Sequence, residues 1–511
     1  MPEPSVDGTI YHRPLCPDGR GVEDLPCDAP CPRGSRPFVL AATILASAMA
    51  FIDGTVVTIA LPALQQNLDA SFSRLQWVVN AYALLLGGLI LVGGGLGDRF
   101  GRRRIFATGI GIFALASLLC ALAPTAEFLI FGRALQGVGA ALLVPQSLAI
   151  IAASFPKEVR GRAIGIWAGA SAITTALGPP IGGVLLDLLD WRAIFWINLP
   201  MAAAAIWLTL THVPESRNDG ATGAVDWQGG LVAVTAFGAL TVGLTQAAEH
   251  GEASALVFVL MGLGLAGVFL FVRVERQATN PLVPGVLFKD SAFTGGNVVT
   301  LFLYGALGGV LFLLPFDLIA HRGLSAAEVG LTMLPIGLVI GVFSRFAGHW
   351  ADGQGPRMPL ALGSFLVAVG TAMLALAVPD YAVGVLLPIL ILSAGMAMVV
   401  APLTTAVINA APDALSGAAS GVNNAASRLA GLFAVAIVGG IASFVFQGEA
   451  DAAQLAGLAG PLRFGELPPP GEANRAVLEA AFLSAYSTAM WAATAGAALA
   501  AFLSFIMLKP R

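Results

Sequence analysis

The stretch Gly94-Gly95-Leu96-Gly97-Asp98-Arg99-Phe100-Gly101-Arg102-Arg103-Arg104 decides the fold, because it separates two long apolar runs. Those runs, 77–96 and 105–123, are each long enough, at about 1.5 Å per residue, to cross a hydrocarbon core of about 30 Å. The charged stretch is therefore predicted to be a tight turn at a membrane surface. Its arginines place that surface on the cytoplasmic side, since positively charged loops are retained there. Its glycines let two helix ends approach closely, and Asp98 is placed to cap or pair with a neighbouring helix end.

The composition extends this prediction to the whole chain. Of the 511 residues, 57% are hydrophobic and 11% are charged, whereas a soluble domain carries about 25% charged residues. We therefore expect an all-α integral membrane protein with little mass outside the bilayer. The chain contains fourteen apolar runs of spanning length, at about 38–64, 77–96, 105–123, 128–153, 163–189, 194–212, 227–248, 255–274, 293–320, 327–350, 360–378, 381–410, 418–446 and 482–508.

The basic residues test this count. The loops that follow even-numbered runs carry most of the Lys and Arg residues outside the spans, whereas the opposite loops hold only Arg74, Arg192, Arg322, Arg463 and Arg475. This asymmetry predicts a multi-pass protein of the cytoplasmic membrane with both termini in the cytoplasm. No basic tract outside these loops is long enough for nucleic acid, so no nucleic-acid partner is expected.

The runs divide the chain into four regions. Residues 1–36, rich in Pro, Gly and Asp, are predicted to be a disordered cytoplasmic tail. Residues 37–213 should form a six-helix bundle, residues 226–275 two inserted helices, and residues 291–511 a second six-helix bundle with an outer loop at 447–480. The segment 348–357 supports an internal repeat, because it keeps the Gly, Asp, Gly and one Arg of the first turn, with Asp352 in the place of Asp98.

The cysteines favour no metal chemistry. Cys120 lies inside an apolar run and is expected to behave as a small hydrophobic residue. Cys16, Cys27 and Cys31 lie in the tail near His12, and their spacing fits no standard metal site. We therefore expect neither a metal nor another cofactor.

Two charged residues lie inside the spans of the first half. Asp53 lies in the first span, where a carboxylate costs several kcal/mol unless it is paired, hydrated or protonated. Such a group suits a site that takes up and releases protons, although a structural acid bonded to a neighbouring helix is the alternative. Arg133 lies in the fourth span and either takes part in coupling or extends its charge to the membrane surface. Gln136, Gly137 and Ala140 form a small, polar face beside it.

The fifth span is rich in helix-perturbing residues. It holds Gly178-Pro179-Pro180 and Gly182-Gly183 within a few residues. In a membrane, glycines permit close helix crossing, and the prolines bend the helix by removing backbone donors. General packing of membrane helices would explain any two of the glycines, but not this order.

These strings together resemble the motifs of the major facilitator superfamily of transporters, in its fourteen-helix drug:proton antiporter branch. The 94–104 turn looks like the loop between helices 2 and 3 of that family. The string from Ile52 to Pro62 is similar to the helix-1 signature of the branch, and 133–141 to the helix-4 signature. The core of the fifth span resembles the helix-5 motif of exporters, with Thr174 in place of one usual glycine.

Three further strings carry the same resemblance, which runs from about Phe38 to Leu508. They are Trp191-Arg192-Ala193-Ile194-Phe195-Trp196-Ile197-Asn198-Leu199-Pro200, Asp226-Trp227-Gln228-Gly229 and Asn423-Asn424-Ala425-Ala426-Ser427-Arg428. The resemblance implies the major facilitator fold, with two six-helix bundles plus two inserted helices. It also implies that Asp53 and Arg133 couple proton movement to transport, and that the conformational switch uses Gly94, Asp98, Arg99, Gly101, Arg102, Gly178, Pro179 and Asp352.

Other polar residues at membrane depth are candidates for the substrate cavity. They are Gln136, Gln146, Asn297, Tyr304, Asp317 and Asn424. The alternative for each is a plain hydrogen bond between helices. For Asp317 we expect a water-accessible position at the outer mouth rather than a second protonation site.

The function expected is proton-coupled export of small amphipathic drugs or antibiotics. The alternative within the transporter class is export of a lipid or an endogenous secondary metabolite. The chain has no GxxxxGK[ST] string, so ATP is not expected as the energy source. It also lacks a paired His–acid pattern, which argues against a membrane-embedded enzyme. The expected partners are a small-molecule substrate, protons and membrane lipid, and the protein is expected to be a monomer.

Overall fold

The computed structural model describes residues 34–217, 226–250, 255–278, 281–412, 415–453, 463–468 and 474–508. The predictions on the tail cysteines and on most of the 1–36 region lie outside these residues. Within them, fourteen helices are long and apolar enough to cross a membrane, as predicted.

The helices of the first half and of the inserted pair follow the predicted runs. They are α1 (Arg36–Asn67), α2 (Phe72–Phe100), α3 (Arg102–Ala121), α4 (Ala126–Ser154), α5 (Lys157–Leu188), α6 (Ala193–Trp196) with α7 (Asn198–His212), α8 (Trp227–His250) and α9 (Ala255–Gln277). A sixth span composed of α6 and α7 is the one place in this half where a predicted run is broken. The break at Ile197 directly precedes Asn198, whose side chain enters the candidate site described below.

The second half contains the other six spans, two of which include a π-helical turn. They are α10 (Ser291–Phe316) with the π-helix η2 (Asp317–His321), α11 (Ala326–Gln354), α12 (Arg357–Ala375), the π-helix η3 (Ala382–Leu386) with α13 (Leu387–Asn409), α14 (Ser416–Ala452) and α15 (Arg475–Met507). A short 3₁₀ helix, η1 (Gly285–Lys289), precedes α10.

Several helices extend beyond the predicted runs. The largest differences occur around the predicted outer loop at 447–480, where α14 continues to Ala452 and α15 already begins at Arg475. Other helices gain a polar first turn from local capping. Ser71, for example, accepts from the Arg74 N–H at the start of α2, which begins at Phe72 and not at 77. Hydropathy reports only the apolar part of a helix, so it misses such polar ends.

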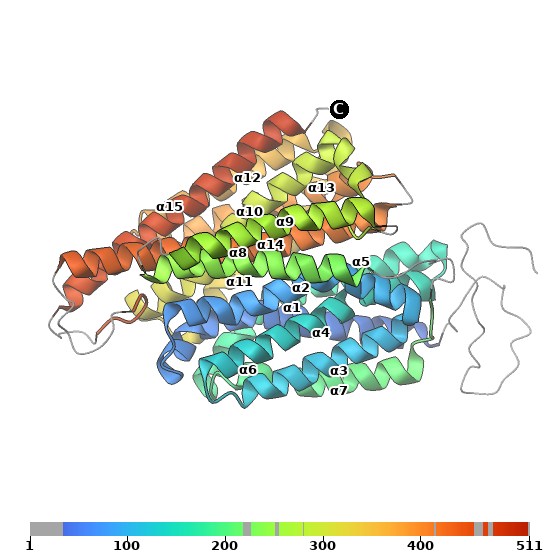
Figure 1. Ribbon diagram of the computed structural model, residues 1–511, viewed down its shortest axis with the longest axis horizontal. Helices are drawn as coiled ribbons and strands as arrows, with labels where there is room; N and C mark the ends of the chain where they lie inside the picture. The colour runs from blue at the N-terminus through green and yellow to red at the C-terminus, as the bar shows by residue number, and fades with distance from the viewer. Residues whose placement is uncertain are drawn as a thin grey trace, which may run out of the picture.

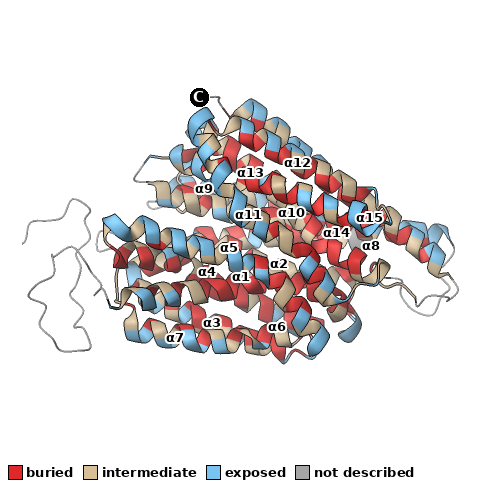
Figure 2. Ribbon diagram, turned by 180° about the vertical axis from the view of Figure 1, so that it is seen from behind, coloured by how far each residue is buried: buried red, intermediate tan, exposed pale blue. Residues whose placement is uncertain are grey.

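The helices form two groups with the inserted pair across their junction. Figure 1 shows α1–α7 on one side, α10–α15 on the other, and α8 with α9 between them. We call the end of the bundle that contains Gly101 the turn end, and the opposite end, which contains Phe464, the closed end. Figure 2 shows that buried residues are concentrated inside the groups. Large apolar side chains such as Phe131 and Phe269 are exposed. That exposure suits a lipid environment.

The two groups meet along two helix pairs. In the first, α5 packs on α11, where Gly183 lies against the backbone of Ala326 and Gly330 against the backbone of Pro179. In the second, α2 packs on α14, and Gln76 Nε2 donates to the Val435 carbonyl over 2.8 Å. Because these close contacts lie in the closed-end half of the helices, they hold the groups together there.

An aromatic cluster fills the closed end. Phe464, which is 2% exposed, packs against Phe72, Phe316 and Phe482, with ring centroids 4.7 to 6.0 Å away. The 463–468 segment that carries it belongs to the link between α14 and α15. It reaches the first half through Gln65 Nε2, which donates to the Phe464 carbonyl over 3.1 Å. Arg463 also pairs with Asp69 at 2.6 Å. These contacts join the two groups at this end.

Candidate functional site

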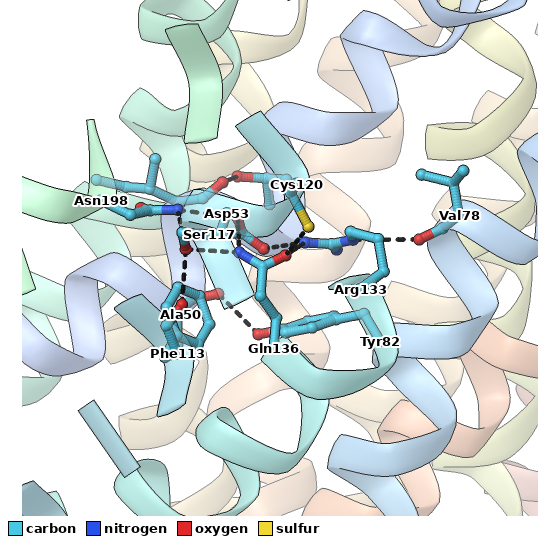
Figure 3. A network of polar contacts seen from close by, with 12 residues as sticks. Ala50, Asp53, Val78, Tyr82, Phe113, Ser117, Cys120, Arg133, Gln136 and Asn198 are labelled. Atoms are coloured by element: carbon cyan, nitrogen blue, oxygen red, sulfur yellow. Dashed lines mark hydrogen bonds and ion pairs between the residues drawn. The ribbon is translucent and has the colours of Figure 1, made fainter. Parts of the chain in front are cut away.

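The centre of the first half holds a polar network built around Asp53. Its carboxylate lies on α1 and is 0% exposed. It accepts hydrogen bonds from Arg133 and Gln136 of α4 and from Asn198 at the start of α7. Gln136 Nε2 lies 3.0 Å and Asn198 Nδ2 3.1 Å from Asp53 Oδ1, and Figure 3 shows these side chains converging on it. Three donors face this carboxylate, an arrangement that suits its ionised form.

Arg133 is enclosed rather than extended to the surface. Its side chain is 2% exposed. Its Nη1 donates to Asp53 and to Gln136 Oε1, the latter over 2.7 Å, and its Nε donates to the Val78 carbonyl over 3.1 Å. The ring of Tyr82 lies beneath the guanidinium, 4.4 Å from its carbon to the ring centroid. The alternative in which Arg133 extends to the membrane surface is therefore wrong in this conformation.

Gln136 and Ser117 complete the network. Gln136 accepts from Arg133 and donates to Asp53, so it lies between the cation and the anion and satisfies both. Ser117 of α3 accepts from Gln136 over 2.8 Å and from Asn198 over 3.2 Å, and donates to the Phe113 carbonyl. With the bond from Arg133 to the Val78 carbonyl, the network joins five helices of the first half: α1, α2, α3, α4 and α7. The structure places Gln136 in this network and not in the wall of the cavity.

Two members of the network were missed as site residues by sequence reasoning. Asn198 belongs to a string that carried only the family resemblance, although an amide inside an apolar run was a usable signal. Ser117 gave no signal, because a serine in an apolar helix usually bonds to its own backbone, as Ser117 also does here.

A cavity of about 790 Å³ lies between the groups. Its wall includes Asp98 and Arg99 at the end of α2, Ala152 near the end of α4, and Gly417 at the start of α14. All four positions lie at the turn end, so the cavity opens there and the aromatic cluster closes the other end. Gly94, Gln146 and Asn424 also line it, and Trp167 and Phe51 provide aromatic surface.

The residues predicted to bind substrate lie in different parts of the structure. Gln146 and Asn424 line the cavity, although Gln146 also donates to the Gly93 carbonyl over 2.8 Å and so ties α4 to α2. Asn297 bonds to the Phe293 carbonyl and to Asn423, which makes it a contact between α10 and α14. Asn297 and half-buried Tyr304 are not part of the cavity wall.

Asp317 does not lie at a water-accessible mouth. It is 1% exposed, and its two oxygens bond to His321 Nδ1 at 2.9 Å and to Arg322 Nε at 2.8 Å. His321 Nε2 lies 3.2 Å from Glu479 of α15, and Arg322 donates to the carbonyls of residues 378 and 379. The π-helical turn brings these side chains together and buries the acid against the closed end. The partners of Asp317 were not predicted from the sequence.

The basic turn is held by a residue that sequence reasoning also missed. Asp98 pairs with Arg102 at 2.8 Å, as its position suggested. Glu215, just after α7, accepts from the backbone N–H groups of Arg103 and Arg104 at 3.0 and 3.3 Å, and so caps α3. Glycine is required at 101 for two reasons. Its φ is +109°, which other residues rarely adopt, and a Cβ there would meet the Glu215 carboxylate. Glu215 could have been nominated from the sequence, because it is a lone acid on the same side of the membrane as the basic turn.

The remaining switch candidates lie at helix contacts. Gly178 packs on Thr55 and Gly182 on Val56 of α1, and the carbonyl of Pro179 meets Gly330 of α11. Asp352 is exposed in the last turn of α11, at the turn end. Arg99 lines the cavity. In the part of the chain that the structure describes, no group of three or more His, Cys, Asp or Glu residues is placed to hold a metal ion.

Comparison with known proteins places this architecture among transporters. Residues 43–435 match the sequence model of the Major Facilitator Superfamily. The multidrug resistance protein Stp of Mycobacterium tuberculosis is 34% identical over 405 residues, which cover 79% of this chain and 75% of that protein. The puromycin resistance protein pur8 of Streptomyces alboniger is 36% identical over 425 residues, covering 82% and 83%. The methylenomycin A resistance protein of Streptomyces coelicolor is 32% identical over 427 residues, covering 80% and 88%.

Solved structures show the same fold at lower identity. A bacterial homologue of the human lysosomal transporter Spinster, in its inward-facing and unoccupied conformation, gives a TM-score of 0.69 at 17% identity and covers 93% of this chain and 97% of that one. A D-xylose–proton symporter gives a TM-score of 0.62 at 18% identity, covering 92% and 98%.

Proposed function

The chain belongs to the major facilitator superfamily of membrane transporters, and on that premise we propose that it is a proton-coupled antiporter that exports small amphipathic drugs or antibiotics. It is a transporter and not an enzyme, and relatives that match most of its length are drug and antibiotic resistance proteins. The observation that supports proton coupling is the fully buried Asp53–Arg133 pair, which bonds directly to α2 through the Val78 carbonyl and to α7 through Asn198.

A proton on Asp53 would change this network in a defined way. It would remove the charge that pairs with Arg133, and it would add a donor where Gln136 and Asn198 now donate. The bonds from Arg133, Gln136 and Asn198 would weaken together, because all three end on the same carboxylate. Loss of the proton would restore them. Protonation at Asp53 therefore favours a different packing of α1 from the one seen here.

The neighbours of α1 carry that change to the junction between the groups. Thr55 and Val56, two and three residues beyond Asp53, pack on Gly178 and Gly182 of α5. Directly beside them, Pro179 of α5 meets Gly330 of α11. A shift of α1 thus acts on the α5–α11 contact that holds the closed end together, and supports alternating access between the two ends.

The cavity provides the substrate site in this proposal. The turn end carries the basic loops and is assigned to the cytoplasm, with both termini. The cavity then faces the cytoplasm and combines aromatic surface from Phe51 and Trp167 with polar groups from Gln146 and Asn424. That mixture suits small molecules with both apolar and polar parts, and it does not specify one compound.

The test is proton release on substrate binding to purified, detergent-solubilised protein, across a panel of antibiotics, lipophilic cations and lipids. The wild type should release protons with at least one antibiotic or lipophilic cation, and Asp53→Asn should bind that compound without release. Asp190→Asn is the matched control, because Asp190 also pairs with an arginine but is exposed. Release that persists in Asp53→Asn would remove this acid from coupling, and release only with lipids would favour a lipid exporter.

A further inference from the structure

The inserted helices α8 and α9 lie across the seam between the two groups. Gly230 of α8 packs on Val92 of α2, and Phe237 of α8 packs on Phe433 of α14, with ring centroids 6.0 Å apart. The turn-end edge of this pair borders the cavity, because Asp226, Pro281 and Leu282 all line the cavity wall. A change at this edge therefore acts directly on the cavity entrance.

Two carboxyl groups meet at that edge. Asp226 precedes α8, and its Oδ1 accepts from the Gly229 N–H over 2.8 Å, which caps the helix. Glu275 lies in the last turns of α9 and is 7% exposed, and its Oε2 accepts from the Val283 N–H over 2.9 Å. Each side chain thus uses one oxygen to hold backbone, and Glu275 fastens the 281–284 segment to the inserted pair.

The other two oxygens face each other over Gly229. A Cβ placed on Gly229 would lie 2.7 Å from Asp226 Oδ2 and 2.7 Å from Glu275 Oε1. The two oxygens therefore lie around the same point, and neither of them receives a hydrogen from any donor among the described residues. Glycine at 229 is required for this approach, which gives a physical reason for the Asp226-Trp227-Gln228-Gly229 string.

Two facing carboxylate oxygens without a donor repel each other, and burial of Glu275 increases the cost. One proton between them turns the repulsion into a carboxyl–carboxylate hydrogen bond. We propose that Asp226 and Glu275 share a single proton and form a second proton-binding site, separate from Asp53, at the entrance of the cavity. A divalent cation fits less well, because the described residues supply no third His, Cys, Asp or Glu ligand there.

Other charged side chains lie near the pair, but the shared proton is the main compensation for the repulsion between the two carboxylates. The groups that line the same cavity are Asp98 and Arg99 of α2 and Arg428 of α14, one acid and two bases. On α9 itself, Arg273 and Arg276 flank Glu275 in sequence. Binding one proton gives the pair a charge of −1, and its release gives −2.

Release of the proton has a structural consequence. The two anions would separate, and Glu275 would no longer hold the Val283 N–H in place. The 281–284 segment would then detach from the inserted pair and widen the cavity entrance. The site itself does not depend on the role of Asp53, but any contribution of its proton to the transport cycle rests on the proposed antiport function.

Infrared difference spectroscopy of the purified full chain tests the site, since it detects the C=O stretch of a protonated carboxyl group. The wild type at neutral pH should show one such acid that disappears in Asp226→Asn and, independently, in Glu275→Gln. Each amide keeps a hydrogen bond between the pair, so both variants should fold. Asp290→Asn is the matched control at the same end, because Asp290 is an exposed helix cap, and it should retain the band, as should Asp53→Asn.

Hydrogen exchange at Val283 gives the second readout. In the wild type its protection should fall at alkaline pH beyond the intrinsic change in exchange rate, and in Glu275→Gln it should stay constant. Loss of the band only in Asp53→Asn would overturn the proposal while leaving the antiport function intact. No protonated band in the wild type, or thermal stabilisation by added Mg²⁺ or Ca²⁺ in the wild type alone, would also overturn it.

Discussion

Asp53 in the first half and Asp317 in the second are both buried acids bonded to an arginine, but their partners come from different distances along the chain. The partners of Asp53 lie 80 and 145 residues away, on α4 and α7. The direct partners of Asp317 lie four and five residues away, in and just after the same π-helical turn.

This difference separates a contact that responds to helix movement from one that moves with its helix. The Asp53 bonds join α1 to α4 and α7, so any shift of α1 against them breaks the bonds. The Asp317 bonds are made within one turn and survive a shift of α10 as a unit. Only the first arrangement lets the protonation state of an acid control how helices pack.

The largest effect is expected from removing the arginine of each pair. Arg133→Ala leaves the Asp53 carboxylate buried beside neutral amides, at a cost of about 3–5 kcal/mol in unfolding free energy. Arg322→Ala should cost less, because His321 remains 2.9 Å from Asp317 as a second hydrogen-bond partner. Denaturant unfolding of the solubilised variants measures both.

Adding Asp53→Asn to Arg133→Ala should recover part of the lost stability, since it removes the unpaired charge. Arg133→Ala should also change the pH profile of transport. Equal losses for the two arginine variants, or an unchanged pH profile, would mean that the two pairs play the same structural role.

The next effect concerns the closed end, which the Asp317 turn supports through Phe316 and Phe482. Phe464→Ala should increase hydrogen exchange at Leu68 and Ala70, at the end of α1. The stability loss should be smaller than the about 3–5 kcal/mol of a core Phe→Ala change, because the 463–468 segment can detach alone. Phe444→Ala is the control, being 54% exposed. If both variants exchange at the wild-type rate, Phe464 does not close this end.

A smaller effect is expected at the basic turn. Its arginines also have one acidic partner nearby in the sequence, Asp98, and one that is distant in the sequence, Glu215. Glu215→Gln removes the charged cap that α3 receives from the end of α7, and should cost about 1 kcal/mol. Asp98→Asn removes a pair between residues only four positions apart, with the acid side chain 40% exposed, and should cost about 0.5 kcal/mol. Thermal unfolding ranks the two variants, and the reverse order would show that the distant cap is dispensable.

The smallest effect is a pH dependence of the 463–468 segment. Burial raises the pKa of Glu466, against the opposing effect of Arg463. Because docking favours the neutral acid, its contribution is complete below the free value of about 4.3 and is lost as the pH rises through the docked pKa. Glu466→Gln should dock independently of pH in this range, as measured by hydrogen exchange at Phe464. Glu449→Gln, at an exposed site on the same end, should keep the wild-type dependence.

Much of the fold was predictable because a membrane span can be recognised from a short, continuous stretch of apolar residues. Each apolar run can be recognised within about 20 residues. Fourteen spans were predicted in this way, and fourteen were found among the residues that the structure describes. Asp53 and Arg133 could be nominated for the same reason, since a charge in an apolar run is conspicuous on its own. The broken sixth span, and the lengths of α14 and α15, were not predicted, because capping and amphipathic ends carry no hydropathy signal.

The sequence by itself determined the membrane class, the number of spans, the family resemblance and the individual charged residues, since each depends on side chains that are close together in the chain. Tertiary structure alone decided that Arg133 pairs with Asp53, that Asn198 and Ser117 join them, that Glu215 caps α3 and that Asp226 meets Glu275. It also buried Asp317, against expectation. The physical reason is that hydrogen bonds and ion pairs act over a few ångströms, and only helix packing brings groups so far apart in sequence within that reach.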